Sequence, residues 1–236
     1  MISYLVWDAG GTLFDTYPAV VAACRAALRS LGYEASTAWL MSLFRQTTAF
    51  ALETIADRFG IPLTSLESAF GAAYDAVEPD FQPPFPFVRH VCAYMCGVGG
   101  WNYIVTHRGR ESLEGLLQAH SMADYFVDWI TKEDPFPRKP DPASFLGLMA
   151  RHGLDPSSGM VIGDRPLDIV AGQRAGLSTC WYGEPPEGTE PDLSIVSYDQ
   201  LLLWLQVQHQ GAKDESCGVL QASCLDKKTT TRPVGG

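Results

Sequence analysis

Apolar side chains follow two different periods along the chain, and the order of these periods predicts the fold. Residues 2–8 form a short apolar run that ends in Asp8, as expected of a buried parallel strand. Residues 18–31 carry apolar side chains three and four positions apart, which is typical of a helix. Pro18 stands near its start and Gly32 follows its end, in agreement with helix boundary preferences. Helical patterns continue through residues 36–78 without an intervening strand pattern.

After a cluster of four prolines between residues 79 and 86, short apolar runs alternate with helical patterns. We predict strands over residues 101–106, 126–131, 160–162, 179–182 and 193–196, and helices over residues 87–95, 111–120, 142–152, 166–175 and 198–207. Alternation of this kind favours an α/β fold, a doubly wound parallel sheet of the Rossmann-like type with helices on both faces.

The helical stretch that follows the first strand is then predicted to be an inserted all-α cap. We expect residues 1–16 and 85–207 to form the α/β core domain and residues 17–84 to form the helical cap domain. Polar residues dominate from Gln208 onward and no periodicity survives there, so we expect residues 208–236 to be a disordered tail.

Charge and composition narrow the class of partner. The chain has a formal net charge of −10 over 236 residues, which argues against a nucleic acid or an anionic membrane as partner. It has neither an apolar run of roughly 18 residues, the length that spans a bilayer, nor the features of a signal peptide. The six cysteines form no CxxC pair, which favours reduced thiols and a cytoplasmic protein.

Chemically reactive side chains fall where predicted strands end. Asp8 begins the segment Asp8-Ala9-Gly10-Gly11-Thr12, Thr106 ends the second strand, and the fourth is followed by Gly163-Asp164-Arg165-Pro166-Leu167-Asp168. Lys139 lies in the loop after the third strand. The carboxyl ends of parallel strands form one edge of a sheet, where ligands bind. Several carboxylates beside one lysine suit Mg²⁺ and a phosphoryl group.

These segments, in this order and spacing, resemble the four motifs of the haloacid dehalogenase superfamily over about residues 1–200. The insertion after the first motif resembles the subclass with a helical cap, to which phosphoglycolate phosphatases belong. The resemblance implies a Mg²⁺-dependent phosphatase that hydrolyses a small phosphorylated metabolite through an aspartyl-phosphate intermediate.

The resemblance also assigns a nucleophile and a set of metal ligands. Asp8 resembles the catalytic nucleophile, which is also a metal ligand, and the carbonyl of Gly10 resembles a second ligand. Asp164 and Asp168 resemble the acidic metal ligands of the fourth motif. Each carboxylate taken alone also has a structural explanation, such as capping a helix, and it is their joint spacing that favours the metal site.

Other residues are expected to meet the substrate. Thr106 resembles the catalytic hydroxyl that holds a phosphoryl oxygen, and Lys139 resembles the catalytic lysine that pairs with the phosphate and Asp8. His107 and Arg108 follow Thr106 directly, so both are candidates for substrate binding. In the predicted cap, Arg45 is our candidate for contact with an anionic substrate, although an exposed helix arginine is the simpler interpretation.

One position departs from the superfamily pattern. Its phosphatases carry a second aspartate two residues after the nucleophile, which protonates the leaving alcohol, and here that residue is Gly10. General acid–base catalysis contributes roughly 10²–10⁴ in rate. The chain could therefore be a phosphatase that is slow on unactivated esters, or one with a substitute acid. His107 and Asp15 are candidates for that acid, although a histidine without chemistry and a supporting aspartate are the simpler interpretations.

Two other interpretations follow from the same departure. Phosphonoacetaldehyde hydrolases also lack this aspartate, but they need a lysine in the cap, and no lysine precedes Lys132. Haloacid dehalogenases need no metal, so the complete motif from Gly163 to Asp168 argues against them. The last interpretation is a catalytically impaired protein that binds phosphate or has a regulatory role.

Overall fold

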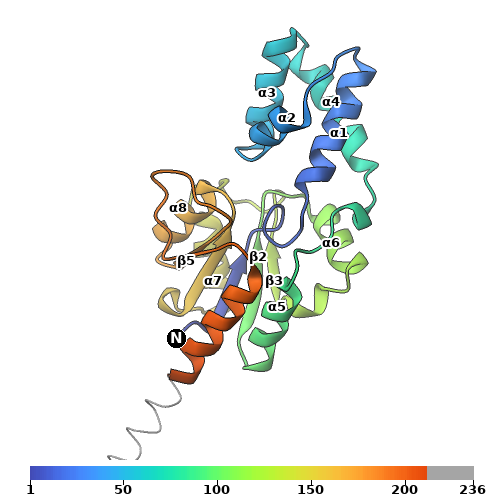
Figure 1. Ribbon diagram of the computed structural model, residues 1–236. Helices are drawn as coiled ribbons and strands as arrows, with labels where there is room; N and C mark the ends of the chain where they lie inside the picture. Colours follow the sequence, from blue (N-terminus) through green and yellow to red (C-terminus); the bar gives the residue numbers. More distant parts are fainter. Residues whose placement is uncertain (212–236) are drawn as a thin grey trace, which may run out of the picture.

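The computed structural model describes residues 1–211, and a parallel sheet lies at its centre (Figure 1). Six strands pair in the order β3-β2-β1-β4-β5-β6, and every neighbouring pair is parallel. The strands are β1 (Tyr4–Trp7), β2 (Trp101–Val105), β3 (Asp128–Ile130), β4 (Gly159–Gly163), β5 (Ser178–Tyr182) and β6 (Leu193–Ile195). The predicted α/β class with a doubly wound parallel sheet is confirmed.

Helices cover both faces of this sheet, which explains why β1 is apolar at every position. Leu5 and Trp7 belong to a buried cluster on one face, whereas Tyr4 and Val6 belong to a second cluster on the other. The first face is covered by α5 (Val88–Gly97), α6 (Arg110–Ala119) and a helix over residues 198–211. The second is covered by α7 (Ala143–His152) and α8 (Pro166–Arg174).

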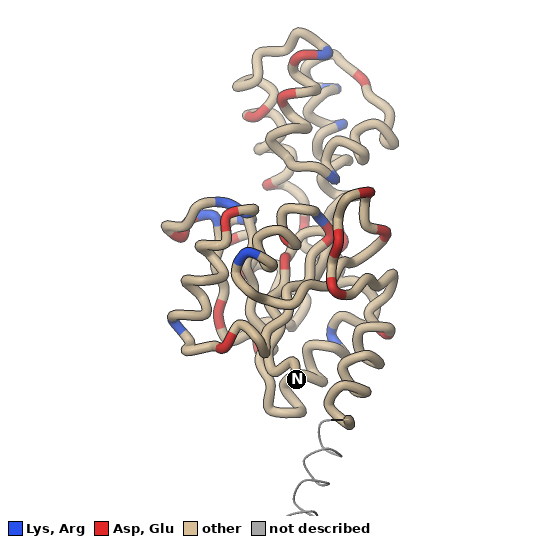
Figure 2. The backbone as a smooth tube through the Cα atoms, turned by 90° about the vertical axis from the view of Figure 1, so that its left-hand side faces the viewer, with Lys and Arg blue, Asp and Glu red and all other residues tan. Residues whose placement is uncertain are grey.

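The segment inserted after β1 is entirely helical and forms its own end of the molecule (Figures 1 and 2). It contains α1 (Tyr17–Ser30), α2 (Thr37–Phe44), α3 (Thr48–Phe59) and α4 (Leu63–Asp75), whose apolar side chains form a separate buried cluster. Ser36 and Thr47 cap the amino ends of α2 and α3 with their side chains. The inserted helical cap is therefore present, and its limits at residues 17 and 84 stay a prediction.

Short 3₁₀ turns complete the connections between these elements. They are η1 (Pro79–Phe81), η2 (Ala123–Tyr125) and η3 (Pro156–Ser158). The first of them, η1, follows the helical cap and leads the chain back toward the sheet. It lies at the start of the proline cluster between residues 79 and 86.

The last described helix corrects one predicted boundary. It continues through residue 211, so the predicted tail cannot begin at residue 208. His209 is buried in this helix. Its Nε2 donates to the carbonyl of Ile2 at 2.7 Å, and its Nδ1 accepts from the Tyr94 hydroxyl at 3.0 Å. A polar side chain buried through hydrogen bonds does not register as apolar periodicity. The remainder of the predicted tail lies outside the described residues.

Charged residues occur at both ends of the molecule, with Lys and Arg positions interspersed among the more numerous Asp and Glu positions (Figure 2). Within residues 1–211, no helix has the length and apolar character needed to cross a membrane. The cysteines of this part, Cys24, Cys92, Cys96 and Cys180, are free thiols.

Candidate active site

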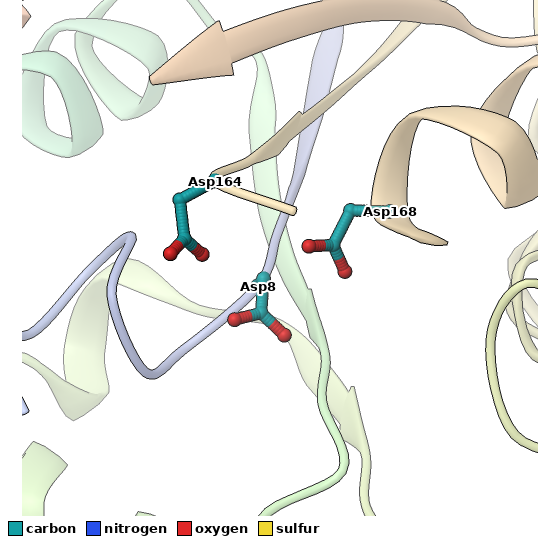
Figure 3. A group of neighbouring side chains, drawn as sticks. All are labelled: Asp8, Asp164 and Asp168. Carbon is teal, nitrogen blue, oxygen red and sulfur yellow. The ribbon is translucent and has the colours of Figure 1, made fainter. Parts of the chain in front are cut away.

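Three carboxylates converge at the carboxyl edge of the sheet (Figure 3). Asp8 follows β1 and Asp164 follows β4, and these strands are neighbours with Trp7 opposite Ile162. Asp168 lies in the first turn of α8. One oxygen from each of the three carboxylates lies within 4.8 Å of the others. The parallel register therefore brings together residues that are more than 150 positions apart in the sequence.

Lys139, from the loop between β3 and α7, joins two of these three carboxylates. Its Nζ donates to Asp8 Oδ1 at 2.7 Å, to Asp168 Oδ1 at 2.5 Å and to the carbonyl of Val105 at 2.9 Å. Burial by itself raises the pKa of Asp8, but the positive charges of Lys139 and Arg165, together with the hydrogen bond from Lys139, outweigh burial and lower that pKa below its usual value. Asp8 is therefore held as a carboxylate, the form that a nucleophile requires.

Asp164 is fixed by two hydroxyl groups. Thr12 donates to Oδ1 at 3.1 Å and Tyr17 donates to Oδ2 at 2.5 Å. Burial raises the pKa of Asp164 to about 7, and the negative charges of Asp8 and Asp168 act in the same direction. A cation bound here would counter this cost of burying a third carboxylate.

The donor atoms fit a hard divalent cation. Oδ2 of Asp8 and Oδ2 of Asp168 are buried and accept no hydrogen bond within the described part of the chain. Carboxylate oxygens are the ligands that Mg²⁺ prefers, and buried oxygens without a partner are costly unless something binds them. Gly10, the remaining predicted ligand, lies in the turn that follows Asp8. The assignment of these residues as metal ligands stays a prediction.

Thr106 and His107 follow β2, the neighbour of β1 on its other side. The Thr106 Oγ1 is buried and accepts a hydrogen bond from the backbone N–H of Arg108 at 3.1 Å, which leaves its own proton available to a ligand. His107 Nε2 accepts from the backbone N–H of Lys139 at 2.9 Å. Burial and the charge of Lys139 lower the pKa of His107 to about 3. A neutral His107 positions Lys139 and is poorly suited to be the substitute acid.

Arg108 is engaged away from the carboxylates. Its Nη2 donates to the Tyr74 hydroxyl at 2.5 Å and to Gln82 Oε1 at 2.8 Å, and its Nη1 donates to Ser112 Oγ at 2.6 Å. Tyr74 belongs to α4, so Arg108 links the loop after β2 to the inserted helices. Contact with a substrate would require these bonds to break, and the predicted substrate role of Arg108 stays a prediction.

Arg45, the candidate from the cap, follows α2 and is exposed. Its guanidinium carbon lies 5.9 Å from the centroid of the Tyr17 ring, within the range of a cation–π contact. Because Tyr17 also binds Asp164, Arg45 lies on the cap side of the carboxylate group. Its predicted contact with an anionic substrate is not tested by this placement.

Two further residues belong to the site that sequence reasoning missed. Arg165 Nη2 lies 3.6 Å from Asp8 Oδ1, and its Nε lies 3.8 Å from Asp168 Oδ2. A cation inside the Gly163–Asp168 segment was a usable signal for Arg165. No signal in the sequence indicated Tyr17, because its contact depends on how α1 leaves the sheet.

The site has no side chain at position 10, and a neighbour limits the space there. A Cβ added at Gly10 would lie 3.0 Å from Thr16 Oγ1. The other candidate acid, Asp15, donates its backbone N–H to the Pro83 carbonyl at 2.8 Å, and burial raises the pKa of its carboxyl group.

The profile of the haloacid dehalogenase-like hydrolases matches residues 5–182. The chain belongs to this family. A phosphoglycolate phosphatase of Vibrio vulnificus is 28% identical to this hydrolase over 217 residues, which cover 85% of this chain and 95% of the relative. A phosphoglycolate phosphatase of Pseudomonas putida is 26% identical and covers 98% of this chain and 88% of its own.

Solved structures agree with this assignment. A hydrolase from Streptococcus pneumoniae TIGR4 is 34% identical, with a TM-score of 0.56, and the match covers 75% of this chain and 91% of that protein. A predicted phosphoglycolate phosphatase from Haemophilus somnus has a TM-score of 0.78 at 19% identity, covering 86% and 98% of the two chains, and shows the shared fold. The protein is thus a haloacid dehalogenase-like hydrolase of the phosphatase type.

Proposed function

We propose that this hydrolase removes the phosphoryl group of a small organophosphate, with Asp8 as the nucleophile and Mg²⁺ as the cofactor. The main support for this proposal is the position of the Lys139 ammonium between Asp8 and Asp168. In addition, Asp8 Oδ2 accepts no hydrogen bond within residues 1–211. A carboxylate kept ionised and with one free oxygen is equipped to attack phosphorus.

The reaction would proceed in two displacements at phosphorus. An oxygen of Asp8 forms a bond to phosphorus while the bond to the leaving alkoxide breaks, which yields an acyl phosphate on Asp8 and an alcohol after protonation by water. Water then attacks the phosphoryl group, so that inorganic phosphate leaves and the Asp8 carboxylate is restored. Lys139, with a phosphoryl oxygen in place of one of its three present acceptors, and the Thr106 hydroxyl would bind the phosphoryl oxygens and stabilise charge that develops there.

Asp8, the Gly10 carbonyl, Asp164 and Asp168 would hold the cation. Bound Mg²⁺ would neutralise the phosphate and allow one anion to approach another. Arg165, close to Asp8 and Asp168, adds a second fixed positive charge beside Lys139. These two basic side chains stand among three carboxylates, so a divalent cation would bring the net charge of these groups from negative to positive.

The glycine at position 10 sets the expected substrate preference. Without a carboxylic acid there, and with His107 neutral, nothing described in the site is poised to protonate an alkoxide. The leaving groups of acyl and aryl phosphates depart without protonation, so these substrates should be hydrolysed faster than sugar phosphates. Because the relatives are named phosphoglycolate phosphatases, phosphoglycolate is the first metabolite to test. These named activities do not favour the alternative of a catalytically impaired phosphate-binding protein.

The test compares substrates with different leaving groups in the presence of Mg²⁺. Acetyl phosphate, an aryl phosphate and phosphoglycolate are assayed with the wild type, with Asp8→Asn and with Gly10→Asp in a Thr16→Ala background, which provides room for the new side chain. We expect Asp8→Asn to abolish turnover, and Gly10→Asp to accelerate unactivated esters by up to roughly 10²-fold. Turnover that persists in Asp8→Asn would exclude the mechanism.

A further inference from the structure

We propose that Tyr17 is a positioning residue for Asp164, through which the orientation of the helical cap controls the affinity of the metal site. This inference rests on the proposed function in one respect, because it takes Asp164 to be a metal ligand. Tyr17 is the first residue of α1, so the contact joins the first turn of the cap to the edge of the sheet.

The two hydroxyl groups on Asp164 determine how its carboxylate is turned. Tyr17 donates to Oδ2 at 2.5 Å and Thr12 donates to Oδ1 at 3.1 Å. With one donor on each oxygen, rotation of the carboxylate about its bond to Cβ would break both hydrogen bonds. The two donors therefore hold the carboxylate in the orientation in which it faces Asp8 (Figure 3).

The turn after β1 is shaped to permit this contact. Gly11 has a φ of +87°, and a Cβ added there would lie 2.4 Å from Asp164 Oδ2 and 2.6 Å from Tyr17 Cε2. Any side chain at position 11 would therefore intrude between the ring and the carboxylate. The absence of a side chain at Gly11 thus leaves room for the ring of Tyr17 beside Asp164, the proposed metal ligand.

Tyr17 is also anchored in the cap. Its ring packs against the buried cluster of α1–α4, and Arg45 lies over it at 5.9 Å from the centroid. A movement of these helices relative to the sheet would carry the hydroxyl away from Asp164. An anion that draws Arg45 toward the site would act on the same ring. Cap position and ligand orientation are therefore mechanically linked.

The size of the effect follows from other metal sites. Removal of a hydrogen-bond partner that orients a metal ligand typically lowers metal affinity by about 10–100-fold. Tyr17→Phe removes only the hydroxyl and keeps the ring against Arg45 and the apolar cluster. Tyr33→Phe is the matched control, because Tyr33 packs on Phe59 in the same helical cluster and its hydroxyl makes no hydrogen bond within residues 1–211.

The experiment measures Mn²⁺ affinity of the full chain by electron paramagnetic resonance, with no substrate present. We expect Tyr17→Phe to raise the dissociation constant for Mn²⁺ about tenfold or more and Tyr33→Phe to leave it unchanged. Asp164→Asn should raise it most. Tight Mn²⁺ binding that is lost in Asp164→Asn but unchanged in Tyr17→Phe would overturn the positioning role and leave the proposed function intact. Absence of Mn²⁺ binding by the wild type would overturn both.

Amide hydrogen exchange provides the readout for the link to the cap. We expect Mg²⁺ to slow amide exchange in the first turns of α1 in the wild type but not in Tyr17→Phe. The two proteins should melt at similar temperatures. Equal protection of α1 by Mg²⁺ in the two proteins would overturn the control of the site by cap orientation.

Discussion

The Lys139 ammonium and the Asp8 carboxylate form an ion pair with 2.7 Å between Nζ and Oδ1, and each side chain is only 1% exposed. The two residues are 131 positions apart, and the pair joins the end of β1 to the loop before α7. Since Asp168 accepts from the same ammonium, one ammonium group donates hydrogen bonds to two buried carboxylates. Stability and the ionised state of the nucleophile therefore depend on the same side chain.

Replacement of this cation should destabilise the protein strongly. Lys139→Met leaves Asp8 and Asp168 buried without their shared hydrogen-bond donor, with only the longer contacts to Arg165, and removal of one member of a buried ion pair costs about 3–5 kcal/mol in the free energy of unfolding. Urea denaturation measures this loss. Lys132→Met is the control, since that side chain is 52% exposed and its Nζ lies 3.8 Å from Glu133, and it should change stability by less than about 1 kcal/mol. Equal effects of the two substitutions would contradict this assignment.

The pH dependence of stability should report on His107. Its folded-state pKa is lowered to about 3, below the value of about 6.5 in an unfolded chain. Between these values the unfolded state binds a proton that the folded state does not. The stability present above pH ~6.5 is therefore lost as the pH falls toward 3.

His107→Gln can retain an acceptor for the Lys139 N–H, because the Gln amide reaches the position of Nε2, and it cannot titrate. We expect this variant to lose less unfolding free energy than the wild type between about pH 7 and pH 5, as measured by urea denaturation at each pH. His90→Asn, at an exposed position, should keep the wild-type slope. A slope that is unchanged in His107→Gln would show that the histidine is protonated in the folded state too.

Substitution of Asn102, which lies outside the candidate active site, should also lower the stability of the protein strongly. It is fully buried, accepts from the Trp7 indole at 3.1 Å, and donates to the carbonyls of Cys92 and Tyr125 at 3.1 and 3.2 Å. Asn102→Leu would leave the buried Trp7 indole N–H without an acceptor and would remove a donor from the carbonyls of Cys92 and Tyr125, at a cost of about 3 kcal/mol. Gln118→Leu, at an exposed position, should change little in the same denaturation assay. A loss below about 1 kcal/mol in Asn102→Leu would show that the partners find other bonds.

The main elements of the site follow from sequence because strand ends meet at one edge of a parallel sheet. Asp8, Asp164 and Asp168 are each placed by a strand or by the helix after it, so their approach needs no detail of side-chain packing. Lys139 comes from the loop after the third strand, which begins at the same edge, and only its catalytic role was predicted through the resemblance of the four motifs. The periodic patterns that predict the strands and helices were therefore enough to place the three carboxylates at one edge of the sheet.

Contacts between the cap and the sheet could not be predicted, because they depend on how two packed units sit together. The bond from Tyr17 to Asp164 and the bonds from Arg108 to Tyr74 and Gln82 are of this kind. His209 was missed for a related reason, since its partners Ile2 and Tyr94 are distant in sequence. Periodicity reports burial of apolar side chains and carries no information on polar pairs formed over such distances.

Direct detection of phosphorylated Asp8 tests the central claim. The wild type is mixed with acetyl phosphate and Mg²⁺, quenched in acid, and digested for mass spectrometry, with Asp8→Asn and Asp15→Asn as parallel samples. We predict one phosphoryl group on Asp8 that accumulates because no acid–base group at Gly10 speeds its hydrolysis, and that is absent from Asp8→Asn but retained in Asp15→Asn. Steady hydrolysis of acetyl phosphate with no label on Asp8, or with the label on another residue, would contradict the account.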